Sequence, residues 1–238
     1  SNEKEQLKLN EATFNELELV HFTGGEPLLT DTHVKFLEKL EQSDTLKNCR
    51  ITYNTNCTQR PDNKTLELWR QSHVVELYFS IDDIKDRFEY QRTGASWATV
   101  LDTLAYFYKM STTNHLFHFN ITWSYLNIYY LPELIDWIKE TLPTNRFGDD
   151  TKIHLQQAVG TCAIKTLTQD QYNALAKKFN GYAELDYILA TIKISLNKPT
   201  RVFNYLEKLD KVRNLAYNHA HSEWEELLID DKYYQLRE

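Results

Sequence analysis

The sequence is poor in the residues that build special sites: it has six glycines, five prolines, three cysteines and one methionine. Three cysteines, an odd number, do not make a disulfide framework, so a reducing compartment such as the cytoplasm is expected. No apolar run approaches the roughly 18 residues that a membrane-spanning helix needs, and no signal peptide is visible. We therefore expect neither a disulfide-stapled secreted domain nor a membrane protein.

The charge balance is acidic, because 27 lysine and arginine residues face 34 aspartate and glutamate residues and leave a net charge of −7. Proteins that bind nucleic acid through its phosphates cluster lysine and arginine, so a nucleic-acid partner is not expected. A chain of 238 residues can bury a sizeable core without staples. Its length fits one large α/β domain or two small ones.

Two of the few glycines are adjacent, in the most distinctive stretch of the chain. An apolar run over residues 17–22 stops at Gly24-Gly25-Glu26-Pro27, and helix signals follow at once. Glycine has no Cβ, so a ligand can lie against the main chain, and Pro27 favours an extended Glu26. The pattern predicts a strand, a tight turn and a helix, with the Glu26 carboxylate at a strand C-terminal end, where α/β sheets place ligands. An amine is its natural partner; a solvated glutamate in an ordinary turn is the alternative.

Strand and helix patterns alternate along the first two thirds of the chain. Strands are predicted at residues 17–23, 50–55, 74–80, 115–123 and 152–158. Helices are predicted at residues 32–42, from Pro61, at 96–110 and after Asn127, with residues 82–94 as a charged connection. This alternation predicts an α/β fold with a parallel sheet and right-handed crossovers.

The pattern changes after Gly160. Helices are predicted at residues 168–179 and 184–196 and from Pro199, and residues 219–238 are amphipathic and acidic. We therefore expect an α/β core over residues 1–160 and an all-helical C-terminal extension over 161–238 that packs on it.

Several candidate site residues fall at or near the C-terminal ends of the predicted strands, namely Gly24, Asn56, Ser80, Asn120 and Gln157. In a parallel sheet these ends meet at one rim, which is how such folds build sites. Ser80 could bond a carboxylate or a ribose hydroxyl. For Asn56 and Asn120, as for Thr122, local turn bonding is the alternative.

Charged residues follow the third predicted strand. Arg92 could clamp a carboxylate with its guanidinium, or form a surface ion pair with Glu89 or Asp86. Asp82 and Asp83 could receive an amine, act as a base, or cap a helix.

Several residues that could be taken for site residues are better explained by packing in the core. Tyr78 and Trp123 are expected in the core, and Cys57 as a buried or half-buried thiol. The histidines of His115-x-x-His118 point to opposite faces of a strand, so no single metal site is expected there. No metal site is expected at His219-x-His221 either, because this pair lies in a polar helical segment without partner ligands nearby.

An ordered set of motifs resembles the radical S-adenosylmethionine (radical SAM) family over residues 17–142. The residues from Gly24 to Leu29 resemble its GGEP motif, which holds the amino group of the methionine moiety. Thr55-Asn56 is similar to its "TN" strand end, and Ser80-Ile81-Asp82 to its "SxD" strand end. The segment from Arg92 to Trp97 resembles the start of the following helix.

The resemblance implies a partial parallel (β/α) barrel, similar in kind to a TIM barrel. It implies two cofactors, S-adenosylmethionine and a [4Fe–4S] cluster, and reductive cleavage of the first to a 5′-deoxyadenosyl radical that abstracts hydrogen from a substrate. Carried onto this sequence, the S-adenosylmethionine-binding residues would be Gly24, Gly25, Glu26, Asn56, Ser80, Asp82, Arg92, Asn120 and Gln157. A catalytic residue is not implied.

One family feature is missing. The cluster is held by three cysteines spaced C-x3-C-x2-C upstream of the glycine motif, whereas this chain has Cys49, Cys57 and Cys162 at unrelated spacings. Because the chain begins Ser1-Asn2, truncation is the first explanation, with the cluster ligands expected upstream, and loss in a degenerate relative is the second.

A short helical C-terminal extension is similar to family members that modify peptides or proteins, so a peptide or protein substrate and an electron donor are the expected partners. With Cys162 alone in that region, an auxiliary four-cysteine cluster is not expected. Two alternatives remain: a non-catalytic binding or scaffold relative, and an unrelated barrel isomerase with Glu26 as its base.

Overall fold

The computed structural model describes residues 14, 16–141, 152–196, 200–213 and 217–228. Its main sheet has five strands in the order β1-β2-β3-β4-β5, and β1 to β3 pair in parallel. The strands are β1 Leu19–Phe22, β2 Arg50–Thr55, β3 Val74–Ser80, β4 His115–Trp123 and β5 Lys152–Gln157. The α/β prediction and all five predicted strands are confirmed.

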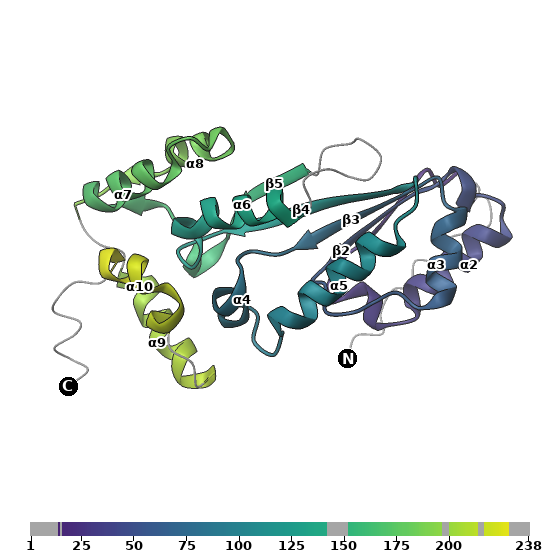
Figure 1. Cartoon of the computed structure of the whole chain (residues 1–238), viewed down its shortest axis with the longest axis horizontal. Coiled ribbons are helices and arrows are strands. Elements are labelled where there is room, and N and C mark those ends of the chain that lie inside the picture. Colours follow the sequence, from purple (N-terminus) through teal and green to yellow (C-terminus); the bar gives the residue numbers. More distant parts are fainter. Residues whose placement is uncertain (1–13, 15, 142–151, 197–199, 214–216, 229–238) are drawn as a thin grey trace. The chain divides into compact units, whose positions relative to one another are not determined.

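The helices that alternate with these strands are α2 Thr32–Gln42, α3 Asn63–Gln71, α4 Lys85–Gln91, α5 Trp97–Met110 and α6 Leu131–Thr141. The C-terminal region holds α7 Gln169–Phe179, α8 Asp186–Thr191, α9 Thr200–Arg213 and α10 Tyr217–Leu228. Figure 1 labels these elements along the chain. None of the helices in the described residues is long and apolar enough to cross a membrane.

The chain divides into two compact units. The first comprises Ser1–Ser80, Ala98–Phe119 and Thr144–Ile153, and the second comprises Ile81–Trp97, Asn120–Pro143 and His154–Glu238. The predicted boundary near residue 160 stays a prediction.

The first unit buries one face of its strands under α2, α3 and α5. Tyr53 of β2 stacks against Phe22 at 4.8 Å between ring centroids and lies 5.2 Å from Trp69 of α3. Phe79 of β3 lies 5.6 Å from Phe107 of α5. The helices form there because their apolar residues recur at helical spacing and meet this face. Leu101 of α5 faces away from this core and is 38% exposed.

The second unit has its own core. The inner face of α6 contributes to it, since Leu131, Leu134, Ile135 and Ile138 are all buried. Trp224 of α10 donates from its indole nitrogen to the backbone oxygen of Tyr125 at 2.9 Å. Trp123 is 1% exposed, which confirms its predicted place in the core.

Two sequence-based expectations about the second unit were wrong. Residues 82–94 are not only a connection, because α4 forms inside them and buries Phe88 and Tyr90. The many charged residues of this segment give it no clear helical pattern in the sequence. The C-terminal region is not all helical, because β6 Thr166–Leu167 pairs in parallel with β7 Lys193–Ile194. Strands of two residues are too short to show alternation in the sequence. The helix predicted to residue 196 ends at Thr191, because β7 begins at Lys193.

Candidate functional site

The turn after β1 is held by the carboxylate of Glu26. Its Oε1 accepts hydrogen bonds from the Leu28 backbone N–H at 3.2 Å and from the Thr55 hydroxyl at 3.0 Å. Its Oε2 accepts from the Asn56 backbone N–H at 2.8 Å. A carboxylate offers about four acceptor positions, so this one is largely occupied by its own protein. Glu26 therefore links the ends of β1 and β2 and fixes the shape of the turn between them.

The two glycines before Glu26 have a backbone that non-glycine residues rarely adopt. Gly24 has φ +91° and Gly25 has φ +22°. Both are exposed, and a Cβ built on either meets nothing within 4 Å. The main chain is therefore open to a ligand at this point, as the sequence predicted for a close approach.

The end of β2 is a tight turn. The Asn56 side-chain oxygen accepts from the Thr58 backbone N–H at 3.0 Å and from the Thr58 hydroxyl at 2.6 Å. Local turn bonding, the alternative for Asn56, is thus present. Cys57 is buried and has φ +60°, a left-handed conformation that keeps this turn short.

Ser80 ends β3 in the same unit. It is half-buried, and its hydroxyl has no hydrogen-bond partner among the residues that the structure describes. The first unit thus brings Gly24, Gly25, Glu26 and Asn56 together, with Ser80 at the end of the next strand.

In the second unit Asp82 and Arg92 are paired. Asp82 Oδ2 accepts from Arg92 Nη2 at 2.7 Å, and its Oδ1 accepts from the Thr122 backbone N–H at 2.8 Å. Arg92 Nε is buried and has no partner within the described part of the chain. The ion-pair alternative for Arg92 is therefore met by Asp82, rather than by Glu89 or Asp86, and this pair uses only part of the donor capacity of the guanidinium.

Of the other predicted site residues, Asn120 lies inside β4, near its C-terminal end, and Gln157 is the last residue of β5. Asn120 is half-buried and makes no side-chain hydrogen bond to any described residue. Gln157 is exposed and donates to the Ile164 backbone oxygen. Ala158 N–H donates to the Trp123 oxygen at 2.9 Å, which places these two strand ends side by side.

Sequence reasoning left the role of Asp83 open, and the structure makes it the centre of a buried network. It is 1% exposed, and its Oδ1 accepts from the Ile84 backbone N–H at 2.8 Å and from Arg87 Nε at 2.9 Å. Arg87 also binds Glu133 at 2.8 Å and lies 4.0 Å above the Tyr130 ring. Burial raises the pKa of Asp83 to about 7, although Arg87 opposes the shift.

The cysteines do not fit an iron–sulfur cluster. Cys49 and Cys57 are buried, Cys162 is half-buried, and burial raises the pKa of the Cys49 thiol to about 11, which disfavours the ligating thiolate. Among the described side chains, no group of three or more His, Cys, Asp and Glu residues could hold a metal ion. His115 packs against Trp69, whereas His118 packs against Tyr78, so the two histidines serve opposite faces of β4 as predicted.

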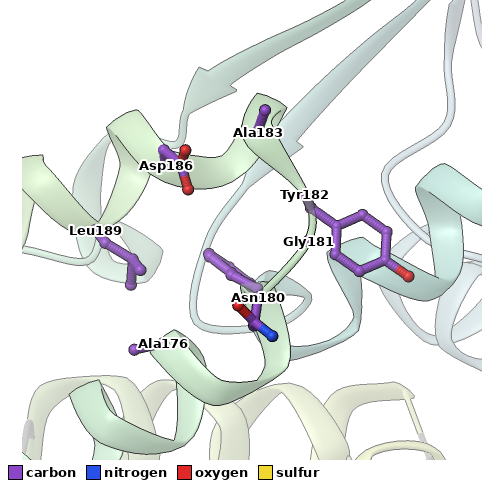
Figure 2. Close-up of a pocket in the computed structure, with 8 residues that line it drawn as sticks. Ala176, Asn180, Gly181, Tyr182, Ala183, Asp186 and Leu189 are labelled. Atoms are coloured by element: carbon purple, nitrogen blue, oxygen red, sulfur yellow. The ribbon is translucent and has the colours of Figure 1, made fainter.

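A cavity of about 400 Å³ lies between α7 and α8 (Figure 2). Its lining includes Phe179, Asn180, Gly181 and Asp186. Tyr182, also in the lining, donates its hydroxyl to Asp136 at 2.6 Å. None of the predicted cofactor residues lines this cavity, so the candidate site remains at the strand ends.

Comparison with protein families gives one match. The model of the radical SAM superfamily matches residues 2–142, which is more than half of the chain. None of the curated proteins matches the sequence.

Solved structures with a similar fold were also found. One, described as native anSMEcpe with bound AdoMet, is 17% identical with a TM-score of 0.51, over 78% of this chain and 52% of that chain. A second, with bound AdoMet and Cp18Cys peptide, is 17% identical with a TM-score of 0.50, over 77% and 52%. SuiB of Streptococcus suis bound to S-adenosylmethionine is 15% identical with a TM-score of 0.47, over 79% and 40%. The chain thus spans about half the length of the anSMEcpe chains, and at these identities the likeness shows the fold alone.

Proposed function

Because this chain belongs to the radical SAM superfamily, we propose that it binds S-adenosylmethionine at the carboxyl ends of its strands and serves the family's radical chemistry. The observation that carries this proposal is the glycine turn. Gly24 and Gly25 expose their main chain in conformations that favour glycine, and Glu26 fixes that turn to the neighbouring strand end.

The residues in the first unit suit the polar groups of this cofactor. The open backbone of Gly24 and Gly25 offers carbonyl oxygens to the methionine amine. The Ser80 hydroxyl is available to a carboxylate or ribose hydroxyl. Glu26 acts through the turn, since its carboxylate already accepts from Leu28, Thr55 and Asn56.

The second unit carries a candidate anion-binding group of its own. Arg92 is held by Asp82, yet its buried Nε has no partner among the described residues and could donate to a carboxylate. Asp82 would then orient Arg92 rather than act as a base. Asn120 and Gln157 remain proposed cofactor residues.

S-adenosylmethionine, when bound next to a reduced [4Fe–4S] cluster, supplies the radical that abstracts a hydrogen atom. The cysteines of this chain do not provide the ligands of that cluster, so the proposal assigns these residues binding, orientation and exclusion of water only. The cluster ligands and the electron donor would come from outside these 238 residues. A non-catalytic S-adenosylmethionine-binding protein is the second candidate, which agrees with the unrelated spacings of Cys49, Cys57 and Cys162.

We extend the proposal to a peptide or protein substrate. One similar fold was solved with a Cp18Cys peptide. In this chain a largely helical region follows the α/β core. The likeness supports the fold alone, so the substrate class needs its own test.

Equilibrium dialysis with radiolabelled S-adenosylmethionine tests the binding proposal. A side chain at Gly24 would occupy the open space beside the turn, so Gly24→Ala should lower the affinity by about tenfold or more. Gly181→Ala is a matched control, because Gly181 has nearly the same φ, +93° against +91°, and open space around its Cβ. Both variants should be destabilised alike, and only Gly24→Ala should lose cofactor. Equal affinities in both variants, or no binding by the unmodified chain, would refute the proposal.

A second measurement tests the statement about the cluster. Anaerobic incubation of the chain with iron and sulfide should leave it without stoichiometric bound iron. Stoichiometric uptake that survives gel filtration would show that its own side chains suffice as cluster ligands.

A further inference from the structure

Two adjacent carboxylates close the segment of residues 82–92 in the second unit. Asp82 Oδ2 accepts from Arg92 Nη2 at 2.7 Å, and Asp83 Oδ2 accepts from Gln91 Nε2 at 3.3 Å. The first two residues of the segment are thus bonded to its last two, along the length of α4. We call the contact between Asp83 and Gln91 the amide bridge. Because a carboxylate only accepts hydrogen bonds, the amide nitrogen of Gln91 must face Asp83.

The helix between these residues depends on Asp83. α4 has seven residues, its N-cap Ile84 makes no side-chain cap bond, and Lys85 starts it in the left-handed region with φ +54°. Isolated helices of this length are not stable in water. Asp83 Oδ1 accepts from the Ile84 N–H at 2.8 Å and from Arg87 Nε at 2.9 Å. One carboxylate therefore holds the first turn of α4 through Oδ1 and its last residue through Oδ2.

The amide bridge starts from a fixed point. Asp83 is 1% exposed, and its partner Arg87 is bound in turn by Glu133 of α6 at 2.8 Å. The backbone oxygen of the preceding residue, Asp82, accepts from Asn127 Nδ2 at 2.6 Å. The position of the Asp83 carboxylate is thus set by α6 and by the turn after β4, and the bridge passes it on to the end of α4.

Arg92 lies directly beyond this end. Its backbone N–H donates to the Phe88 oxygen at 2.9 Å, so the start of its side chain follows the last turn of α4. The side chain is 28% exposed, and its pair with Asp82 uses only part of its donor capacity. An arginine side chain has many rotamers, and ordering it on binding costs affinity. Fixing the end of α4 lowers this cost.

We propose that Asp83 is a positioning residue, which holds the end of α4 through Gln91 and thereby presents the Arg92 guanidinium to the carboxylate of a ligand. Asp83 itself touches no ligand. The inference rests on the proposed function, which gives Arg92 a ligand carboxylate. A purely structural Asp83 would stabilise the fold without changing how Arg92 distinguishes one ligand from another.

The test compares S-adenosylmethionine with its decarboxylated analogue, by equilibrium dialysis on the full chain. Gln91→Met removes the amide bridge at similar size and without a change of charge. It should lower the affinity for S-adenosylmethionine about three- to tenfold, the cost of ordering one side chain. The affinity for the analogue should stay the same, because the analogue has no carboxylate for Arg92. An equal loss for both ligands, or no loss for either, overturns the inference.

A paired exchange separates the bridge from general damage to α4. Asp83→Asn combined with Gln91→Glu reverses donor and acceptor at unchanged net charge, so the new amide donates to the new carboxylate. This double variant should recover the preference for S-adenosylmethionine that Gln91→Met loses. Asp86→Asn, at an exposed position of α4, is the control and should bind both ligands like the unmodified chain. A double variant as weak as Gln91→Met overturns the inference.

A readout without ligand separates this inference from the proposed function. Nitrogen NMR of the arginine side chains should show slower rotation of the Arg92 guanidinium in the unmodified chain and in the double variant than in Gln91→Met. Equal rotation in all three overturns the positioning role. A chain that binds no S-adenosylmethionine overturns the proposed function, and the NMR signal then decides by itself whether Asp83 positions Arg92.

Discussion

At the scale of single residues, the candidate site contains carboxylates that hold the protein's own turns and side chains in place. Glu26 is predicted to meet an amine, and its oxygens also accept hydrogen bonds from Leu28, Thr55 and Asn56. Asp82 likewise supports Arg92 and Thr122. Carboxylates of this kind position the atoms that a ligand would touch, and their loss should affect stability as well as binding.

We expect Glu26→Gln to be destabilised. The new NH₂ group faces donors, so at least one bond to the carboxylate is lost, and such charge-assisted bonds contribute about 1.5–3 kcal/mol. Urea unfolding should show this fall in the free energy of unfolding. Glu18→Gln, at an exposed position just before β1, is the control and should unfold like the unmodified chain. Equal stability of the two variants would contradict the role of Glu26 in the turn.

The buried Asp83 predicts a dependence of stability on pH. Its folded pKa, about 7, lies above the value for an unfolded aspartate, so the folded state holds the proton more tightly. The stability that this gives is complete below about pH 4 and is lost as the pH rises towards 7. The free energy of unfolding should therefore fall by up to about 1 kcal/mol per pH unit between pH 5 and 7.

Urea unfolding from pH 5 to 8 measures this slope. Asp83→Asn should flatten it, because asparagine does not titrate. Asp86→Asn, at an exposed neighbouring position, should keep the slope of the unmodified chain. An unchanged slope in Asp83→Asn would show that other groups set the pH dependence.

At the scale of elements, α7 shows how sequence signals and tertiary contacts combine. Its first turn is closed by a reciprocal cap: the Thr168 hydroxyl accepts from the Gln171 N–H at 3.3 Å, and the Gln171 side-chain oxygen accepts from the Thr168 N–H at 2.9 Å. Gln171 is fully buried and its Nε2 also donates to the Leu227 oxygen of α10 at 3.0 Å. A residue suited to a helix end thereby also joins two helices.

These contacts predict an order of stabilities. Thr168→Ala loses one cap bond and should cost about 1 kcal/mol. Gln171→Ala should cost more, about 2 kcal/mol, because it leaves two half-buried backbone groups, the Thr168 N–H and the Leu227 oxygen, without this partner and empties a fully buried position. Thermal unfolding of the two variants checks the order. The reverse order would show that the link to α10 contributes nothing.

At the scale of the whole molecule, the chain is acidic, with a net charge of −7 and a calculated isoelectric point near 5.7. Charge repulsion between copies therefore disappears about one pH unit below neutrality. We expect a solubility minimum near pH 5.7, measured as turbidity against pH at fixed protein and salt. A minimum more than about one pH unit away would mean that titration of the folded chain differs from that of its sequence.

The elements and their order follow from local sequence patterns. Short runs rich in strand formers placed β1 to β5, and helical patterns between them placed α2, α3, α5 and α6, because such patterns can be recognised in short stretches of sequence. The glycine turn was also visible, since adjacent glycines are rare in this chain. The sequence did not predict the short or charged elements α4, β6 and β7. A short charged helix or a two-residue strand shows no clear hydrophobic periodicity.

The use of individual side chains was settled by tertiary contacts instead. These contacts paired Arg92 with Asp82, buried Asp83 under Arg87, and left the amide oxygen of Asn54 without a partner among the described residues. Tyr78, expected in the core, is half-buried instead. These outcomes depend on which residues meet across neighbouring strands and helices, and such long-range contacts are fixed by packing rather than by local sequence.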